Sequence, residues 1–466
     1  MTKARRIKIA YIGGGSRGWA HTLMNDLALC GDLTGEVALY DIDPAMAALN
    51  RRWGRRVNES PQARSRWDYT VAASLPAALK GADFVFASIQ PGPIRMMGSD
   101  LEIPARYGIL HTVGDTTGPA GLVRALRAVG EYAAIARAVR KHCPKAWVVN
   151  FSNPMSVCTR TLYKVFPQIK AFGCCHEVFG TQHRLAALLK EYRGIEVDRR
   201  RIRTNVLGVN HFTWIDKAAY QGIDLIELYR RKMNEKGEVR PIAEREIPSL
   251  KYFGHRGQVG YDLFRRYGIL AAAGERHIVE FLPFYLKDVR TLHRWGVALT
   301  PYSYRIGRWT DSPRQFRRRL ADPSPLELHA SDEETVRQVK ALLGLGGFRT
   351  NVNLPNAGQH EGLPPGAVVE TNAWFSENSV RPQPAGRLPM GVESWVLRAV
   401  YSQEMIVEAA LRKDKHLAFG AILNDPLMTL TTDKAWKMFG QMLRATRPML
   451  RGWDIGDAPS KTGRAV

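Results

Sequence analysis

The N-terminal part of the chain alternates between short apolar runs and a segment with helical periodicity. Ile7–Ile12 is a short apolar run that ends at three glycines, which is typical of a buried parallel strand. A second apolar run follows at Val37–Tyr40. Between the two runs, apolar residues recur at helical spacing at Trp19, Leu23, Met24 and Leu27. The pattern therefore predicts a strand, a helix and a second strand.

Glycines follow the first predicted strand in the spacing G-x-G-x-x-G. Such a turn lets the backbone approach a pyrophosphate, and the next helix offers unpaired N–H groups to that anion. Asp41 ends the second predicted strand, 23 residues after Gly18, where it can accept hydrogen bonds from a ribose. This spacing favours NAD over NADP, with Asp43 as a nearby competitor for the role. The expected cofactor contacts are Gly13, Gly14, Gly15, Ser16, Arg17, Gly18 and Asp41.

The alternation of strands and helices continues along the chain. Asp83–Ile89 and Ala146–Phe151 are further apolar runs, and Gly121–Val139 between them has apolar residues spaced for one helix face. This order predicts an α/β fold with a Rossmann-like, doubly wound parallel sheet. Ligands of such sheets bind beyond the carboxyl ends of the strands.

The regular alternation ends near residue 190. Segments rich in Arg and Pro follow, and Asn351–Pro389 is so dense in Pro, Gly and Asn that we expect loops there. Helical periodicity returns at Ser394–Leu411. We therefore predict a Rossmann-like NAD-binding domain over residues 1–190. A mixed α+β domain over residues 191–466 would carry the substrate site and the oligomer interface.

Charge and cysteine content narrow the class of protein. The chain has 67 Lys and Arg against 44 Asp and Glu, a net charge of +23. Such charge can indicate a nucleic-acid partner, but the basic residues form only small groups without interleaved aromatics, which favours a solvated basic surface. No apolar run reaches the roughly 18 residues of a membrane span. Five cysteines without a secretory leader indicate a cytoplasmic protein with free thiols.

Two segments contain possible metal ligands, and two carboxylates stand in small-residue surroundings. Cys175 and His211 are a thiol and an imidazole of the kind that bind divalent ions, although their separation fits no zinc finger. On the residues alone, a buried cysteine and a core histidine explain such a pair more often. Asp115 and Glu275 are, by composition alone, more typical of turns or surfaces. Arg95 follows a Pro-Gly-Pro turn and is either a substrate contact or a surface charge.

Taken together, these motifs resemble the NAD-dependent glycoside hydrolases of family 4. The resemblance spans nearly the whole chain, and its motifs occur in a specific order. The matching segments are Ile12–Ser16, Arg95, Asp100–Pro104, Tyr107–Gly108, Gly118–Pro119, Asn153–Pro154, Cys175–His176, Gly208–His211, Asn353–Pro355 and Gly386–Pro389.

The resemblance implies hydrolysis of an α-glycosidic bond by a redox route, an exception to glycosidases with two carboxylates. NAD⁺ would oxidise C3 of the sugar transiently, a base would remove the C2 proton, the glycosidic oxygen would leave, and water would add. Mn²⁺ or another divalent ion, held by Cys175 and His211, would stabilise the enediolate. A hydroxy-acid or sugar dehydrogenase of similar fold is the alternative enzyme, and a basic nucleic-acid-binding protein is the alternative outside enzymes.

The resemblance also implies roles for single residues. Glu275, which follows a Tyr-Gly turn, occupies the place of the base, with Tyr261, Tyr267 and Asp262 as rivals. His176 is the candidate acid, and Asp115 is the alternative. Further residues would bind sugar hydroxyls or flank the metal, namely Arg95, Asn153 and Asn210.

Substrate preference follows from two local motifs. Gly114–Thr117 and Cys175–Gln182 look more like the α-glucosidase and α-galacturonidase branch than like members that act on 6-phosphorylated sugars. We therefore expect an α-galacturonide or a neutral α-glucoside or α-galactoside as substrate. The carboxylate of a uronide would find partners by charge in Arg276, His277 or Arg290. Relatives imply a homodimer or homotetramer, and we expect no nucleic-acid or membrane partner.

Overall fold

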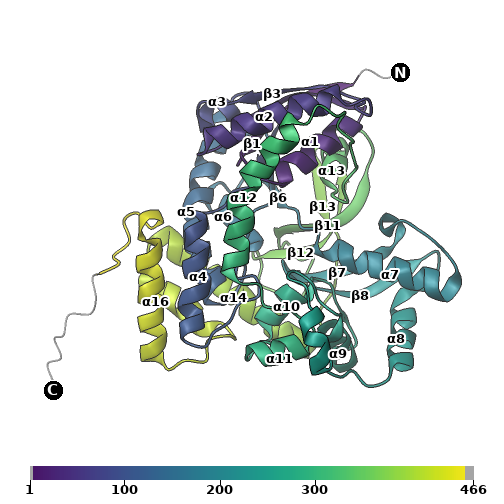
Figure 1. The fold of residues 1–466 in the computed structure, drawn as a ribbon, viewed down its shortest axis with the longest axis vertical. Coiled ribbons are helices and arrows are strands. Elements are labelled where there is room, and N and C mark those ends of the chain that lie inside the picture. Colours follow the sequence, from purple (N-terminus) through teal and green to yellow (C-terminus); the bar gives the residue numbers. More distant parts are fainter. Residues whose placement is uncertain (1–3, 457–466) are drawn as a thin grey trace.

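A nine-stranded sheet forms the centre of the molecule (Figure 1). The computed structural model describes residues 4–456. Its parallel strands lie in the order β3-β2-β1-β4-β5-β6, which is the order of a Rossmann-type doubly wound sheet, so the predicted fold class is confirmed. The bounds of these strands are β1 (Arg5–Ile12), β2 (Leu33–Tyr40), β3 (Trp67–Val71), β4 (Phe84–Ala87), β5 (Trp147–Asn150) and β6 (Lys170–Gly173).

Helices cover both faces of the sheet, each over its own apolar core. One face carries α1 (Trp19–Leu29), α2 (Pro44–Glu59) and α13 (Thr335–Leu342). The other face carries α3 (Leu75–Leu79), α5 (Gly118–His142) and α6 (Met155–Val165). The predicted first helix is thus confirmed, except that Trp19 does not face the core and is 38% exposed.

Helix α5 differs from its predicted form. The expected helix over Gly121–Val139 has one apolar face, whereas α5 is longer, is buried on all sides over residues 118–129, and has a single buried face only beyond them. It packs between α4 (Ile94–Arg106), α6 and the C-terminal helices, which enclose the arginines of its first half, whereas Arg137 and Arg140 near its end are exposed. Arg124 and Arg127 are both buried. The burial of both arginines was not predicted, because sequence periodicity does not show a second layer of helices.

The segment Asn351–Pro389 contains strands as well as loops, so the expectation of loops holds for residues 356–367 and 383–389 and was wrong for the rest. Antiparallel strands β11 (Phe348–Pro355), β12 (Val368–Ser376) and β13 (Ser379–Pro382) extend the parallel sheet beyond β6. Their inward positions carry polar residues that bond to one another, as when Asn351 donates to Glu370 at 2.7 Å. Apolar residues such as Val352 and Leu354 alternate with the polar ones in β11, but the surrounding Pro, Gly and Asn residues favoured loops. The sheet therefore crosses the boundary proposed at residue 190.

The remaining elements form the mixed α+β part that the sequence predicts. A four-stranded sheet contains β7 (Arg203–Val209), β8 (Phe212–Tyr220), β9 (Ile223–Asp224) and β10 (Leu270–Ala271). Beside it lie α7 (Glu177–Arg193), α8 (Leu225–Lys236), α9 (Gln258–Tyr267), α10 (Glu275–Phe281) and α11 (Val289–Arg294). The C-terminal helices α14 (Met390–Arg412), α15 (Lys415–Asn424) and α16 (Thr432–Thr446) pack against α5. Helix α14 confirms the helical periodicity predicted at Ser394–Leu411.

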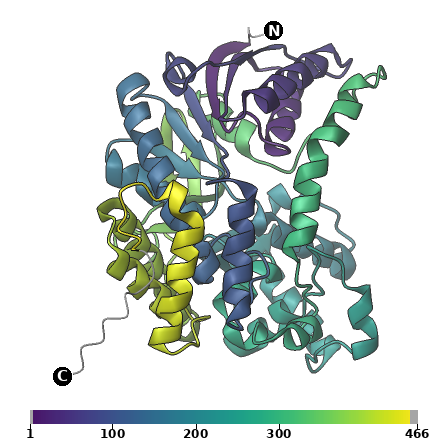
Figure 2. The ribbon, with the colours of Figure 1, turned by 60° about the vertical axis from the view of Figure 1, so that its left-hand side comes forward.

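A long helix joins the two parts of the molecule. Helix α12 (Tyr302–Ala321) runs from the mixed part to the outer side of α2, as the green ribbon in Figure 2 shows. Arg17 donates to the Trp309 carbonyl and Arg56 to the Arg319 carbonyl at 2.6 Å. Within residues 4–456, no helix has the length and apolar character to cross a membrane.

Candidate active site

The glycine-rich turn lies where a dinucleotide binds in a doubly wound sheet. It follows β1 directly, and a Cβ on Gly13 would lie 2.0 Å from the Ser88 carbonyl oxygen, so only glycine fits there. Among the described side chains none caps α1, whose N-cap is Gly18, so its first N–H groups are open to an anion. These features fit a pyrophosphate at this turn.

The other residues predicted for the cofactor share the turn. The Asp41 carboxylate accepts the Gly15 N–H at 2.7 Å. The competitor Asp43 caps α2 by accepting the Met46 N–H at 3.1 Å, which leaves Asp41 as the better candidate for the ribose. The rest of the turn is placed by backbone bonds of Gly14 and Ser16 and by stacking of Arg17 on Trp309 at 3.8 Å.

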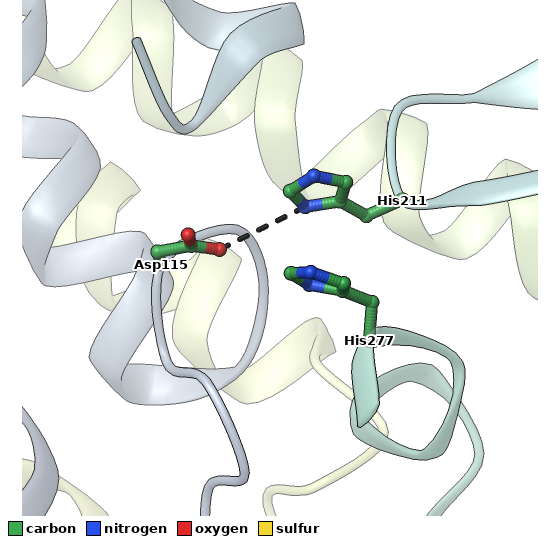
Figure 3. A group of neighbouring side chains, drawn as sticks. All are labelled: Asp115, His211 and His277. Atoms are coloured by element: carbon green, nitrogen blue, oxygen red, sulfur yellow. Dashed lines mark ion pairs between the residues drawn. The ribbon is translucent and has the colours of Figure 1, made fainter. Parts of the chain in front are cut away.

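A buried cluster lies beside the carboxyl ends of the strands, where three segments meet (Figure 3). Asp115 comes from the loop before α5, His211 from the turn between β7 and β8, and His277 from α10. Their potential ligand atoms all lie within 4.8 Å of one another. Asp115 Oδ1 is 3.7 Å from His211 Nδ1, and the two imidazole rings stack with centres 3.7 Å apart. Nitrogen and carboxylate oxygen donors so close together suit a divalent ion.

The tight turn after β7 places His211. Its φ is +66°, a left-handed conformation that is uncommon outside glycine. Gly208, three residues earlier, has φ +114°. The Thr116 hydroxyl is 2.7 Å from His211 Nδ1 and orients the ring. Strained backbone that the surroundings hold in place is found most often at functional sites.

The charges in the cluster depend on one another. Burial, and then the nearby His277, lower the pKa of His211 to about 3, so this imidazole is neutral and can act as a ligand. Burial opposes the charged form of His277, yet the Glu177 carboxylate at 3.5 Å raises its pKa above the usual value. Burial alone would raise the pKa of Asp115, but His211 and His277 lower it below its usual range. The cluster thus holds an ionised carboxylate beside a neutral imidazole.

Cys175 lies near this cluster but is not one of the three grouped residues. It follows β6 directly and is buried. Burial and the neighbouring Glu370 raise the pKa of its thiol well above the usual value, whereas Asn210 lowers it. A divalent ion would reverse this balance, because a coordinating thiol loses its proton.

Buried polar atoms beside the cluster have no partner among the described residues. Asn153 donates to Asp115 at 3.0 Å and Asn210 to Glu370 at 3.1 Å, yet Oδ1 of each asparagine remains unpaired. Nδ1 of His277 is unpaired as well. Buried polar groups nearly always have a partner, so these atoms indicate room for an ion or a hydroxylated ligand.

Glu275 does not reach the cluster. Its carboxylate accepts the N–H groups of Gly257 at 2.9 Å and Gly260 at 2.7 Å, and it lies 3.2 Å from His255 Nδ1. It therefore holds the first turn of α9, where helix N–H groups lack partners. Two of its rivals also have other contacts, because Asp262 accepts from Arg266 and Tyr285, and Tyr267 packs on Trp214.

Of the remaining predicted residues, one lies next to the cluster in sequence and the others are wholly or partly exposed. The His176 side chain is 46% exposed, lies 3.3 Å from Glu333 and packs against Trp19. Arg276 is adjacent to His277 in α10. Arg95 is exposed at the start of α4. Arg290 forms an ion pair with Glu244 on the surface, so the structure does not bring it to the cluster.

Comparison with known proteins identifies the family. Residues 8–191 match the model of family 4 glycosyl hydrolases, and residues 206–428 match the model of their C-terminal domain. The chain belongs to glycosyl hydrolase family 4. The predicted resemblance and the enzyme class, a glycoside hydrolase, are thereby confirmed.

Individual relatives of this family 4 chain agree in sequence and fold. An alpha-galacturonidase of Thermoanaerobacterium saccharolyticum is 49% identical over 457 residues, covering 97% of this chain and 98% of that protein. The crystal structure of Bacillus subtilis lplD is 47% identical, with a TM-score of 0.88 over 94% of this chain and 100% of that chain. The 6-phospho-beta glucosidase of Thermotoga maritima, solved with manganese, NAD⁺ and glucose-6-phosphate, shares the fold at 20% identity and a TM-score of 0.77. The match covers 96% of this chain and 99% of the Thermotoga maritima chain.

Sequence reasoning about this family 4 chain missed several polar residues of the site. Glu177 could have been found from the sequence, because it directly follows the Cys-His pair, but no role was predicted for it. Arg124 donates to the Asn153 carbonyl at 3.1 Å, and its only signal was an arginine within an apolar helix. Glu370 comes from the segment expected to be loops. Thr116 had no signal, since its role depends on the fold alone.

Proposed function

We propose that this chain is an NAD- and Mn²⁺-dependent α-galacturonidase. The observation that carries the proposal is its likeness over almost the full length to an alpha-galacturonidase, at 49% identity. The buried cluster of Asp115, His211 and His277 beside a dinucleotide-type glycine turn supports it. A transient oxidation needs a nicotinamide cofactor, and an anion that forms beside a ketone needs a cation nearby.

The residues present fit both groups. The glycine turn with Asp41 would hold NAD, and His211 would hold the divalent ion. When bound, NAD⁺ accepts a hydride reversibly and the ion acts as a Lewis acid on sugar oxygens. Asn153 and Asn210 offer unpaired oxygens to sugar hydroxyls, and exposed Arg95 remains a proposed contact.

The proposed metal ligands are His211 with Cys175, from the family pattern, together with Asp115 and His277, which lie beside His211. Replacing Cys175 by Ser should weaken Mn²⁺ binding at least tenfold and abolish most turnover, because a neutral hydroxyl replaces a thiolate. Calorimetric Mn²⁺ titration of this variant and of His277→Ala measures each ligand separately. The exposed His329→Ala is the control. Near-normal Mn²⁺ affinity in Cys175→Ser would remove this residue from the ligand set.

Proton transfer is proposed for Glu275 as base and His176 as acid. Asp115 is the poorer acid, because neighbouring histidines lower the pKa of its carboxyl and keep it ionised. Glu275 and Tyr261 line the same pocket beside α9. The base role of Glu275 therefore requires that its carboxylate leave two backbone N–H groups during turnover.

Substitution Glu275→Gln tests the base role. If Glu275 is the base, exchange of the C2 proton with solvent is lost while NAD binding persists. The same substitution removes a charged acceptor at α9 and should lower the free energy of unfolding by about 1–2 kcal/mol. Proton exchange is followed by NMR in deuterated buffer on folded protein. Unchanged exchange would assign the base role to another residue, and Tyr261→Phe is then the next variant.

A panel of aryl glycosides tests the proposed function itself. The α-galacturonide, α-glucuronide, α-galactoside, α-glucoside and a 6-phosphate are each incubated with enzyme, NAD⁺, Mn²⁺ and a thiol reductant. Aryl release from the galacturonide without net NADH, lost on removal of NAD⁺ or metal, is expected. NADH without aryl release would indicate a dehydrogenase. Tight, salt-sensitive binding of duplex DNA without turnover would indicate a nucleic-acid-binding protein.

Assembly and location complete the proposal. We propose a homodimer or homotetramer, as the resemblance implies, and light scattering of the purified enzyme measures it. All five cysteines are free, which suits the reducing cytoplasm, where we propose that the enzyme works.

A further inference from the structure

Three arginine side chains surround the ring of Phe253. Their Cζ atoms lie 4.8, 5.8 and 5.9 Å from the ring centre, for Arg276, Arg305 and Arg308 respectively. Arg276 comes from α10 and the other two from the start of α12. Like charges repel when they are gathered in a region partly removed from water, so this grouping is unfavourable without a compensating anion.

The protein itself supplies no direct counter-ion to these arginines. Among residues 4–456, no carboxylate forms an ion pair with any of the three. Arg305 donates from Nη1 to the Val113 carbonyl and from Nη2 to the Thr112 carbonyl, and both acceptors are neutral. Its Nε, and Nη1 of Arg276, are buried donors without a partner. Each such donor carries a desolvation cost that an acceptor would relieve.

Nearby carboxylates are engaged elsewhere. Glu275, which directly precedes Arg276 in α10, accepts the N–H groups of Gly257 and Gly260. Glu280, one turn further along α10, accepts through Oε1 the N–H groups of Val113 at 2.8 Å and Gly114 at 2.9 Å. Asp115 is bonded to Asn153 and grouped with the two histidines. Glu280 and Asp115 act on Arg305 only over a longer distance. The arginines therefore keep an excess of positive charge.

The arginines and the histidine cluster share one loop. Thr112 donates through its hydroxyl to the Arg276 carbonyl and accepts from Arg305 through its own carbonyl. Asp115 lies three residues further along this loop, and His277 directly follows Arg276 in α10. A single sugar ring bound at the cluster can therefore also present a substituent to the arginines.

We propose that Arg276, Arg305 and Arg308 hold the carboxylate of a uronic acid and thereby select uronides over neutral sugars. This inference rests on the proposed function. A guanidinium group matches a carboxylate with two parallel hydrogen bonds and opposite charge. The hydroxymethyl group of a neutral hexose offers neither charge nor two acceptors, and it would leave the buried donors poorly paired. Arg305 and Arg308 had no signal in the sequence, because only the fold brings α12 to α10.

The test compares variants on a charged and a neutral substrate that differ only at C6. In Arg276→Met and in Arg308→Met, kcat/KM for an aryl α-galacturonide should fall about 100-fold. For the matching α-galactoside it should change less than about threefold, because that substrate lacks the carboxylate. Arg308 is exposed, so its replacement leaves the core intact, and thermal unfolding checks the fold of both variants. Arg276→Lys keeps the charge but cannot form two parallel hydrogen bonds. Its kcat/KM for the galacturonide should therefore lie between those of wild type and Arg276→Met.

Binding is measured without turnover as well. Calorimetry of the enzyme with NAD and Mn²⁺ should show galacturonate binding that weakens in both Met variants, and galactose binding that does not. Arg240→Met, an arginine paired with Glu238 on the surface, is the matched control and should keep the wild-type ratio of the two substrates.

The outcomes separate this inference from the proposed function. If wild type prefers the galacturonide and the variants keep that preference, the arginine site is wrong and the proposed function stands. If wild type cleaves the galactoside but not the galacturonide, both are wrong. If galactose 6-phosphate binds more tightly than galacturonate, and the variants lose that binding, the site takes a phosphate and the uronate assignment is overturned.

Discussion

At the scale of single residues, the site depends on which charges are buried together. The Glu177 carboxylate favours the protonated form of His277, while His211 is kept neutral by burial and by that neighbour. Asp115 faces both rings and stays ionised because of them. These residues act as one unit, so a change in any of them alters the protonation of the others.

Asp115→Asn is the clearest test of this unit. The amide removes the negative charge, so Mn²⁺ affinity should fall about 10–100-fold. The pKa of His277 should fall too, because the Asp115 charge raises it. Calorimetric Mn²⁺ titration and NMR titration of His277 measure the two effects. Asp68→Asn, at an exposed carboxylate paired with Arg6, is the control. Unchanged Mn²⁺ affinity in Asp115→Asn would show that the cluster does not bind the ion.

At the scale of elements, a single buried arginine connects three helices. Arg127 of α5 forms two bonds to Asp100 of α4, at 2.9 and 2.6 Å, and a third to Thr446 of α16 at 2.9 Å. Both members of the ion pair are almost fully buried. Because α5 begins directly after the loop with Asp115, this packing also fixes the position of the site.

Arg127→Met should destabilise the protein strongly. It leaves the Asp100 carboxylate buried without a partner, which costs about 3–5 kcal/mol in the free energy of unfolding. Adding Asp100→Leu should recover much of the loss, because no buried charge then remains. Urea denaturation of the two variants measures both values. A double variant as unstable as the single one would mean that packing, and not the charge, causes the loss.

At the scale of the whole molecule, the two halves of the chain share one sheet. Strand β11 pairs with β6 at Asn353 and Gly173, and the core on that face contains Val352, Leu354 and Phe375 from the C-terminal half. Helix α12 adds contacts to α2. The N-terminal half is therefore not a closed unit, although it contains the whole parallel sheet.

A fragment of residues 1–190 should not fold cooperatively on its own. It would expose the edge of β6 and lose apolar cover from β11, β12 and α13, which favours aggregation. Circular dichroism during heating measures its cooperativity, and co-expression with residues 191–466 should restore soluble protein. A sharp thermal transition of the isolated fragment would contradict the shared sheet and support a boundary at residue 190.

Much of the nucleotide-binding half could be predicted because its signals are local. The glycine turn, α1 and Asp41 lie within one short stretch, and each is defined by its neighbours in sequence. Glu275 illustrates the limit of such reasoning. The family resemblance assigns it the role of base, but the sequence does not show that its partners Gly257 and Gly260, 18 and 15 residues away, lie at the start of α9.

The parallel sheet, the family and most of the residue types at the site can be predicted from the amino-acid sequence alone. These follow from periodicity within single elements and from the order of motifs along the chain. Three features became clear only from the folded chain: strands β11 and β12 extend the sheet, Asp115 and His277 join His211, and α12 brings arginines to Phe253. These features have no local signal because the residues that form them are far apart along the chain. Hydrogen bonds and charges between residues some hundred positions apart, such as Thr116 and His211, arise only when the chain is folded.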